Sequence, residues 1–224
     1  MKMPSADILL KLWEQGKALS SLKRVLLLMK WLFPEASPET WPIGKRDANL
    51  FRLRQLLFGD TLPCYAKCPN CGEPLEFDLS VEALISTETQ TSDLLSLTVD
   101  QETITFRLPT TQDLIDSTDV SGLLSRCMVS NCTLTPTVQT QMMAQMAQAD
   151  PLADLQIKMT CPVCDHAWST PFDIVSYFWV ELERWAHQTL EAVHILAKTY
   201  GWSETSILNL SKWRRDYYLR MING

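Results

Sequence analysis

The chain has 224 residues, a formal net charge of −6 and a hydrophobic fraction of 46%. A chain of this length can bury a substantial core, as one large domain or two small ones. The acidic balance argues against general affinity for a phosphate backbone, because nucleic-acid-binding modules usually carry a basic surface. The longest apolar run is too short to cross a bilayer and the amphipathic N-terminus is unlike a signal peptide, so we expect a soluble, cytosolic protein.

Hydrophobic periodicity predicts helices at the N-terminal end of the chain. The third of them is expected to point Leu50, Leu53, Leu56 and Leu57 toward the core. Serine residues precede the first two helices at capping positions, and a glycine follows the third. The predicted helices cover residues 5–15, 20–32 and 45–58.

The middle of the chain has a different character. Residues 94–99 and 103–108 are rich in β-formers and flank Asp100-Gln101-Glu102, which predicts a hairpin. A helix is expected from Thr110 or Thr111 to about Arg126. A further helix is predicted over residues 137–149, followed by a strand over residues 155–159.

The C-terminal part is predicted to be helical to its end. One long helix is expected over residues 172–200, with Gly201 as its end signal. Two shorter helices follow, with Ser203 and Ser211 as their caps.

Two Cys-Pro-x-Cys knuckles are the strongest signal in the sequence: Cys68-Pro69-Asn70-Cys71 and Cys161-Pro162-Val163-Cys164. Each supplies two thiolates at a spacing that lets both bind one metal, and the proline restrains the turn. Each is also followed by a Phe-Asp pair. These features predict one zinc ribbon in two halves, holding one structural Zn²⁺ per chain, although the ligands alone do not distinguish zinc from iron.

The expected fold class is therefore α+β and mainly α-helical. N-terminal and C-terminal helices would be joined by a split zinc ribbon that carries an inserted region of β-hairpin and helices. The expected organisation is an N-terminal helical region (1–63), two ribbon halves (64–79 and 155–174), an insert (80–154) and a C-terminal helical region (175–224).

Other readings of the cysteines are weaker. Four unrelated buried thiols are one alternative and thiol exchange is another, but exchange motifs usually open a helix, whereas these knuckles precede extended sequence. His166 is a conceivable substitute ligand and Cys64 a weaker competitor, while Cys127 and Cys132 are expected to be ordinary buried thiols. His187, seven residues before His194, is expected to have a packing or surface role.

Four cysteines fill the coordination shell of zinc and leave no position for an activated water, so a structural site is expected. The sequence contains no phosphate-binding loop, dinucleotide fingerprint or nucleophile elbow. We therefore expect a protein that is not an enzyme and has no small-molecule substrate.

Eight tryptophans gather toward the two helical ends of the chain. Tryptophan, tyrosine and arginine are the residues that most often dominate protein interfaces. The locally basic, aromatic C-terminal end is thus a candidate docking surface, with a packed stripe on a solvated helix as the alternative. The candidate partner-binding residues are His194, Tyr200, Trp202, Trp213, Arg214, Arg215 and Tyr217.

Eight stretches of the sequence carry a resemblance to a known family: residues 9–16, 44–47, 53–59, 68–77, 161–168, 171–173, 191–204 and 207–208. On these stretches the chain resembles the baseplate hub assembly chaperone family of T-even-type contractile phage tails, in the zinc-ribbon form found in phage-tail-like contractile injection systems. The resemblance covers nearly the whole chain and is most specific near the C-terminus. Asp165 departs from the glycine expected after the second knuckle, which puts that turn in doubt.

The resemblance implies assembly work without catalysis, as a chaperone-like factor or a minor structural component. The implied partners are baseplate, hub or spike proteins of a contractile tail, in the cytoplasm of a bacterial host, and the resemblance leaves open whether the protein stays in the finished particle. Neither nucleic acid nor membrane insertion is expected. A nucleic-acid-binding zinc ribbon is the alternative function, and the acidic balance argues against it.

Overall fold

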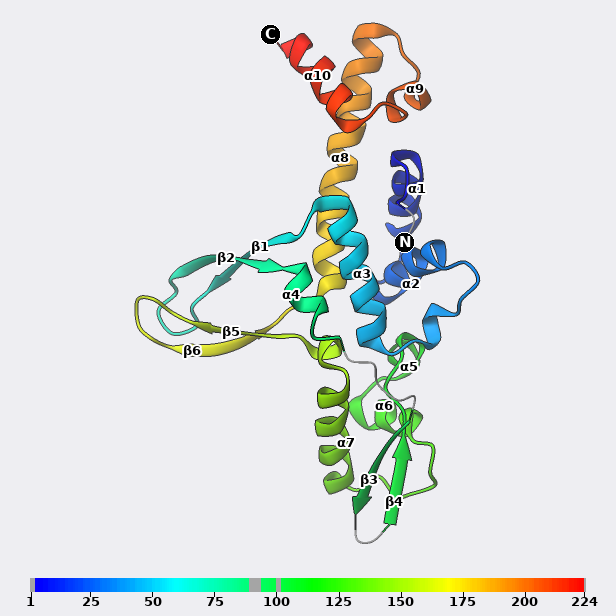
Figure 1. Ribbon diagram of the computed structural model, residues 1–224, viewed down its shortest axis with the longest axis vertical. Helices are drawn as coiled ribbons and strands as arrows, with labels where there is room; N and C mark the ends of the chain where they lie inside the picture. The colour runs from blue at the N-terminus through cyan, green and yellow to red at the C-terminus, as the bar shows by residue number, and fades with distance from the viewer. Residues whose placement is uncertain (1–2, 89–93, 100–101, 224) are drawn as a thin grey trace.

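The structure, a computed structural model, describes residues 3–88, 94–99 and 102–223. Its fold is α+β, with helices and small antiparallel hairpins, as expected. The 27-residue helix α8 (Ile174–Tyr200) is about 40 Å long and forms the axis of an elongated molecule. Two hairpin arms project sideways from its N-terminal part, and a separate helix-and-hairpin unit extends below it (Figure 1).

Three N-terminal helices pack along α8 and share a hydrophobic core with it. Leu50 and Leu53 are fully buried there, as predicted, and Leu57 is partly buried. The prediction for Leu56 is wrong, because its side chain is 42% exposed. Six positions after Leu50, it points roughly 120° away on a helix with 3.6 residues per turn. The three helices are α1 (Ala6–Gly16), α2 (Ser21–Leu32) and α3 (Ile43–Phe58), with the 3₁₀ turn η1 (Pro38–Thr40) before α3.

Each of the two arms is an antiparallel hairpin of neighbouring strands. The two hairpins lie far apart from each other in the sequence. Strand β1 (Thr61–Lys67) pairs with β2 (Pro74–Ser80), so that Cys64 faces Phe77 across the ladder. Strand β5 (Gln156–Thr160) pairs with β6 (Ala167–Pro171) in the same manner. The arms run side by side, and each carries one cysteine knuckle at its tip (Figure 1).

The insert has its own hydrophobic core. This core is separate from the one that α1, α2, α3 and α8, here called the helical body, share with one another. The predicted hairpin is present as β3 (Leu95–Val99) and β4 (Glu102–Phe106), while Asp100 and Gln101 of its expected turn lie outside the described residues. Phe106, Cys127 and Met142 are among its most buried side chains. Helix α7 (Pro136–Ala149) covers this core, and the short helix α4 (Val81–Ile85) follows β2 on the way into the insert.

The helix predicted to run from Thr110 or Thr111 to Arg126 is in fact two helices. Helix α5 (Thr111–Asp116) and helix α6 (Val120–Cys127) are separated by residues 117–119, whose backbone is extended at Ser117 and Asp119. The Asp119 carboxylate accepts a hydrogen bond from the Gly122 N–H at 2.7 Å and so caps α6. Short polar side chains compete in this way with the helical backbone, which breaks the predicted helix.

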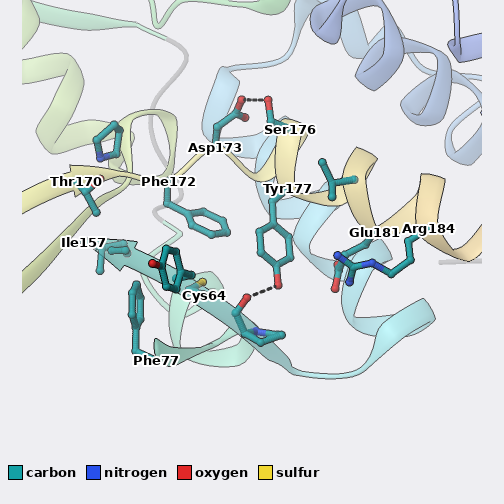
Figure 2. A pocket seen from close by; sticks show the side chains of 15 residues that line it. Cys64, Phe77, Ile157, Thr170, Phe172, Asp173, Ser176, Tyr177, Glu181 and Arg184 are labelled. Atoms are coloured by element: carbon teal, nitrogen blue, oxygen red, sulfur yellow. Dashed lines mark hydrogen bonds between the residues drawn. The ribbon is translucent and has the colours of Figure 1, made fainter. Parts of the chain in front are cut away.

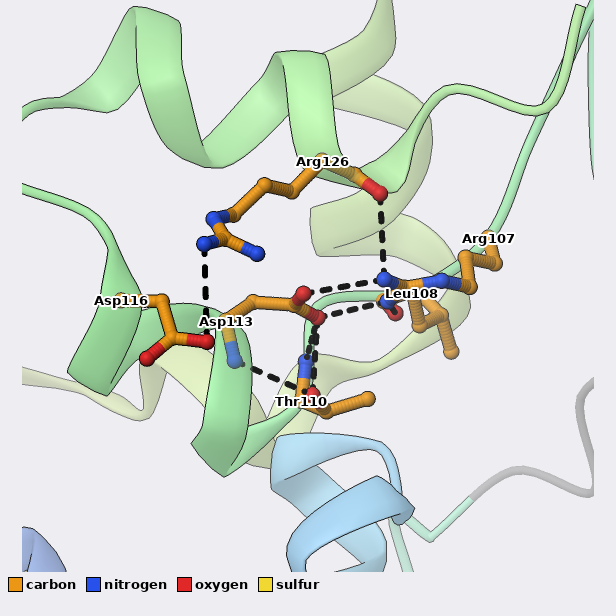
Figure 3. A network of polar contacts seen from close by, with 6 residues as sticks. All are labelled: Arg107, Leu108, Thr110, Asp113, Asp116 and Arg126. Atoms are coloured by element: carbon orange, nitrogen blue, oxygen red, sulfur yellow. Dashed lines mark hydrogen bonds and ion pairs between the residues drawn. The ribbon is translucent and has the colours of Figure 1, made fainter.

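A buried polar network stabilises the N-terminal end of α5 (Figure 3). The Asp113 carboxylate accepts hydrogen bonds from the Arg107 guanidinium, at 2.9 Å to Nη2, and from both the backbone N–H and the hydroxyl of Thr110. Thr110 in turn accepts from the Asp113 N–H, which completes a capping box. These bonds, chiefly that from Arg107, lower the pKa of Asp113 to about 2.

The insert joins the body through close contacts with α3. The Gly44 N–H donates to the Asp150 carboxylate at 2.9 Å, just before the 3₁₀ turn η2 (Pro151–Asp154). A Cβ atom at position 44 would lie 1.6 Å from Asp150 Oδ1, so any other residue would displace the Asp150 carboxylate from this bond. Buried Arg46 pairs with Asp47 at 2.7 Å and donates to Thr111 of α5 at 3.1 Å. The orientation of the insert is thus fixed by directional bonds as well as by apolar packing.

The C-terminal helices follow the predicted order with one shift in a boundary. Helix α8 begins at Ile174 rather than at residue 172, because the Asp173 carboxylate caps it by accepting from the Val175 N–H at 2.9 Å. It ends at Gly201, whose φ of 69° is left-handed. Helices α9 (Glu204–Leu208) and α10 (Lys212–Asn223) then fold back against α8. None of the helices in the described part of the chain combines the length and apolar character that a bilayer crossing requires.

Candidate metal centre

The two knuckles have the same backbone geometry at the tips of the two arms. In the first, the Cys68 N–H donates to the Glu73 carbonyl and the Gly72 N–H donates to the Cys68 carbonyl, both at 2.9 Å. In the second, Cys161 bonds to the His166 carbonyl at 2.9 Å and receives a bond from Asp165 at 3.0 Å. The sequence echo between the knuckles is therefore also a structural one.

The residue after each second cysteine has a left-handed backbone. Gly72 has a φ of 77° and Asp165 a φ of 53°. Glycine adopts this conformation freely, and aspartate is among the few other residues that tolerate it. The doubt raised by Asp165 about the second turn is therefore resolved, because the turn keeps the shape that Gly72 gives the first.

The four knuckle cysteines converge on one point. All four Sγ atoms lie within 4.8 Å of one another. Cys68 Sγ is 3.7 Å from Cys164 Sγ, and Cys71 Sγ is 3.6 Å from Cys161 Sγ, so each short distance joins the two arms. Disulfide sulfurs would be about 2 Å apart. Sulfurs placed about 2.3 Å from a tetrahedral zinc ion are roughly 3.8 Å apart, which is close to the spacing found here.

The cysteine thiols of the cluster differ in pKa. The Asn70 side-chain amide donates to Cys164 Sγ at 3.5 Å and, with the His166 backbone N–H, lowers the pKa of Cys164 to about 6. At Cys71 the Glu73 N–H acts in the same direction, but partial desolvation within the cluster and bonds with the other three thiols raise its pKa to about 12. A divalent cation at the centre of the four sulfurs would favour every thiolate and release the protons.

Access to the centre is one-sided. Cys68 and Cys161 are 2% and 0% exposed, whereas Cys71 is exposed and Cys164 is half-buried. The first cysteine of each knuckle thus lies inside and the second faces solvent. An ion could enter from the solvent side without any rearrangement of the helical body.

The weaker candidate ligands lie outside this cluster. His166 is exposed, and its ring stacks on Trp168 at 6.1 Å. Cys64 lies on β1 below the tip, where its thiol donates to the Leu62 carbonyl at 3.4 Å. Cys127 is buried as predicted, but Cys132 is only half-buried. The exposed His187 has its ring edge-on to Trp13 at 5.5 Å, which fits the expected packing role.

The candidate docking residues fall into two groups near the C-terminus. Tyr200 and Trp202 stack on each other at 4.8 Å and pack against Tyr218. Trp213, which is 68% exposed, stacks on the exposed Tyr217 at 5.5 Å. The remaining exposed candidates are Arg214 and His194.

Arg215 differs from the other candidates because it is only 8% exposed. Its guanidinium donates to the carbonyls of Leu208, at 3.3 Å, and Leu210, at 2.8 Å. These carbonyls lie at the end of α9, where helical carbonyls lack intrahelical partners. Arg215 therefore holds α9 to α10 and is not available on the surface.

Two features of the structure are not among the sequence predictions, one on α10 and one between α3 and α8. Met221 is 62% exposed and continues the line of Trp213 and Tyr217 at i, i+4, i+8 spacing, which the helical periodicity could have revealed. Arg54 of α3 bonds bidentately to Glu181 of α8 and also donates to the carbonyls of Gly59 and Thr61 at the root of the first arm. No sequence motif signals that pair, whose members lie 127 residues apart.

Comparisons of the chain with protein-family models, with curated proteins and with solved structures give no match. The fold and the site define the class to which the chain belongs: an α+β protein with a four-cysteine cluster held between two hairpin arms. The resemblance to hub assembly chaperones remains a prediction from sequence motifs.

Proposed function

We propose that the four cysteines bind one structural Zn²⁺ as a split zinc ribbon, and that the protein is a non-enzymatic assembly factor. The observation that supports the metal is the 3.6 and 3.7 Å spacing of sulfurs contributed by both arms. Four thiolates complete the zinc shell, so the ion would act as a clamp and supply no catalysis. Cys68, Cys71, Cys161 and Cys164 would be its ligands.

The clamp would join the two halves of the chain at a distance from the core. The arms start from different elements, the first directly after α3 and the second directly before α8. Arg54, bound to Glu181 and to both carbonyls at the root of β1, holds these elements together at the base. The metal would hold them at the tips. Two arms that are joined at both the base and the tips would keep α3 and α8, and the surfaces they carry, in a constant relative orientation.

The surface that we propose for docking is the α10 stripe, formed by Trp213, Tyr217 and Met221. All three side chains are exposed and lie on one face of the last helix. Arg220 lies over the Tyr217 ring at 5.9 Å, and Arg214 is exposed beside them. Exposed aromatic side chains with flanking arginines are typical of interface hot spots. The basic character of this helix, in a chain with net charge −6, favours an acidic partner surface.

The motifs in the sequence favour hub, spike or other baseplate proteins of a contractile tail or phage-tail-like injection system as the partners. The proposed role is chaperone-like assistance in their folding or association, or service as a minor component of the baseplate. The Cys-four ribbon and the aromatic end are compatible with either role. Neither role requires a catalytic residue.

Elemental analysis tests the metal. We expect about one zinc per chain in the purified protein and loss of that zinc in Cys68→Ser. Cys64→Ser is the matched control, because it removes a thiol from the same arm but outside the cluster. Zinc that persists in the Cys68→Ser/Cys161→Ser double variant would exclude the shared site.

Co-expression with tail hub and spike proteins, followed by affinity capture, tests the function. We expect a complex that Trp213→Ala/Tyr217→Ala weakens and that Val129→Ala, an equally exposed apolar site on the insert, leaves intact. A gel-shift assay with single- and double-stranded nucleic acid at low salt tests the alternative. No complex with any tail component, or a salt-sensitive shift of nucleic acid, would reject the proposal.

A further inference from the structure

A cavity of about 500 Å³ lies where the two arms meet the start of α8 (Figure 2). Phe77 of β2 and Ile157 of β5 both line it, on the side across from Tyr177, so each arm contributes a side chain (Figure 2). Phe172 and Tyr177 close it on the side of the helical body, with their rings 5.3 Å apart. A volume of this size lies within the range of about 300–1,000 Å³ that is usual for ligand-binding sites.

The interior of the cavity is largely apolar, and one hydrogen bond links its two sides. The Tyr177 hydroxyl donates to the Pro63 carbonyl at 3.0 Å and so holds the α8 side of the cavity to strand β1. Burial raises the pKa of Tyr177 to about 12, so its ring remains neutral. At the rim, Val180 leaves an apolar side chain 55% exposed. These features provide a preformed place for an aromatic or large aliphatic side chain.

Among the described residues, the charged side chains around the cavity have a hydrogen-bond or ion-pair partner, with one exception. Glu181 binds the Arg54 guanidinium through both oxygens, at 2.7 and 2.8 Å. Asp173 accepts bonds from the Val175 N–H and the Ser176 hydroxyl. Arg184, on the next turn of α8, is exposed and has no hydrogen bond or ion pair with any residue that the structure describes. A ligand that complements this rim therefore carries a negative charge next to its apolar group.

The walls of the cavity favour an extended peptide over a compact ligand. Strands β1, β5 and β6 line it, and each belongs to a two-stranded sheet. Within the described strands, each therefore has one edge whose N–H and C=O groups have no strand partner. An extended segment can bond to such an edge while its side chains enter adjacent pockets.

We propose that this cavity, the arm-root pocket, binds an extended segment of a protein partner in which an aromatic or large aliphatic side chain lies next to a carboxylate. The apolar side chain fills the space between Phe77, Ile157 and Tyr177, and the carboxylate pairs with Arg184. The site is distinct from the α10 stripe and involves no residue of it. Because each arm contributes a side chain, the pocket depends on the arms being held together.

Fluorescence anisotropy with labelled six-residue peptides tests the proposal. The first probe carries one Phe between two Asp residues, and the second has Lys in place of both Asp residues. We expect the acidic probe to bind at least about tenfold more tightly than the basic one. Arg184→Glu and Val180→Glu are both expected to weaken the acidic probe by about tenfold or more. Both positions are exposed at the rim, so the variants should fold, which circular dichroism checks.

Lys198→Glu is the matched control, since it makes the same charge change on an exposed position of α8 far along the helix from the pocket. It should bind the acidic probe as the wild type does. Equal affinity for the two probes, unchanged binding by Arg184→Glu, or no binding of the acidic probe at about 1 mM protein would overturn the proposal. Displacement of the probe by free phenylacetate as effectively as by unlabelled peptide would show a small-molecule site and contradict the peptide assignment.

Discussion

Asp165 occupies the position that glycine has in the other knuckle, and its left-handed backbone has a conformational cost. For residues other than glycine that cost is on the order of 1 kcal/mol, and it is smaller for Asp and Asn than for most. We therefore expect Asp165→Gly to raise the free energy of unfolding by about 0.5–1 kcal/mol and Gly72→Asp to lower it by a similar amount. Urea unfolding of the metal-loaded protein measures both. If the two substitutions change the free energy of unfolding in the same direction, the left-handed turns of the two knuckles are not equivalent.

Asp113 gives the protein a defined sensitivity to acid. Its hydrogen bonds, chiefly that from Arg107, hold its pKa near 2 in the folded protein, below the ordinary value of 3.8. The stabilisation is therefore complete above about pH 4 and is lost as the pH falls toward 2. The difference between these pKa values corresponds to about 2 kcal/mol.

Comparison of the wild type with Asp113→Asn isolates this effect. The comparison is needed because burial raises the pKa of Asp150. Protonation of Asp150 at low pH therefore favours the folded protein, whereas protonation of Asp113 favours the unfolded one. The difference in unfolding free energy between the two proteins should be largest between pH 5 and 7 and should narrow toward pH 2. A difference that is constant over this range would contradict the role assigned to Asp113.

At the scale of single residues, sequence reasoning identified the chemistry more reliably than the surroundings. The cluster of four cysteines follows from their spacing, because two thiols in a Cys-Pro-x-Cys turn must point to one side. Arg215 was expected on the surface because its neighbours are polar and aromatic. Its burial depends on the carbonyls at the end of α9, which reach it only through the turn between the two helices. That contact has no counterpart in local sequence.

Among the elements, helix α3 is joined to α8 by the most consequential polar contact. Arg54 is 2% exposed, and its side chain satisfies Glu181 and two backbone carbonyls at once. Arg54→Met would leave those acceptors without a donor in a buried place. We expect it to lower the free energy of unfolding by about 3–5 kcal/mol, as is usual when one partner of a buried pair is removed.

Urea unfolding measures this loss, with Lys198→Met as the control for removing a cation from an exposed position. The control should change stability by no more than about 0.5 kcal/mol. The double variant Arg54→Met/Glu181→Met should recover part of the loss, because no unpaired carboxylate remains. A loss below about 1 kcal/mol in Arg54→Met would mean that the contact does not join the helices as described.

Elements with clear end signals were the easiest to predict. Gly59 and Gly201 mark helix ends, because glycine adopts the left-handed backbone found there at little cost. The division between α5 and α6 was missed, because residues 117–119 were read as helical. Asp119 was the available signal, since it is a strong N-cap followed by a short apolar stripe. A periodic pattern alone does not distinguish one helix from two in line.

At the scale of the molecule, the proposed metal should stabilise the arms more than the helical body. In the part of the chain that the structure describes, neither the helical core nor the insert core contains a knuckle residue. We therefore expect chelation of the metal to leave most of the far-UV circular dichroism signal intact while the arms become accessible to protease. Limited proteolysis with mass spectrometry should place the new cuts within residues 64–79 and 156–171. Global loss of helicity on chelation would contradict this division.

The overall organisation was predictable only in outline. The two knuckles imply that distant segments meet, and hence that residues between them form an insert. The presence of a second core in that insert did not follow, because its members, such as Ile104 and Met142, are spread over several weakly patterned elements. The arm-root pocket was equally invisible. Phe77, Ile157 and Tyr177 become neighbours only once both arms lie against α8.

The separation of the two knuckles in the sequence also affects the order in which they are synthesised. Cys71 and Cys161 are 90 residues apart, and translation proceeds at about 5–20 residues per second. The first pair of thiols therefore leaves the ribosome about 5–20 s before the second pair exists. During that interval the growing chain presents a two-thiol half-site that can be oxidised or can capture a metal with the wrong partners. Assembly of the proposed metal site therefore requires that those thiols stay reduced until the second arm has been synthesised.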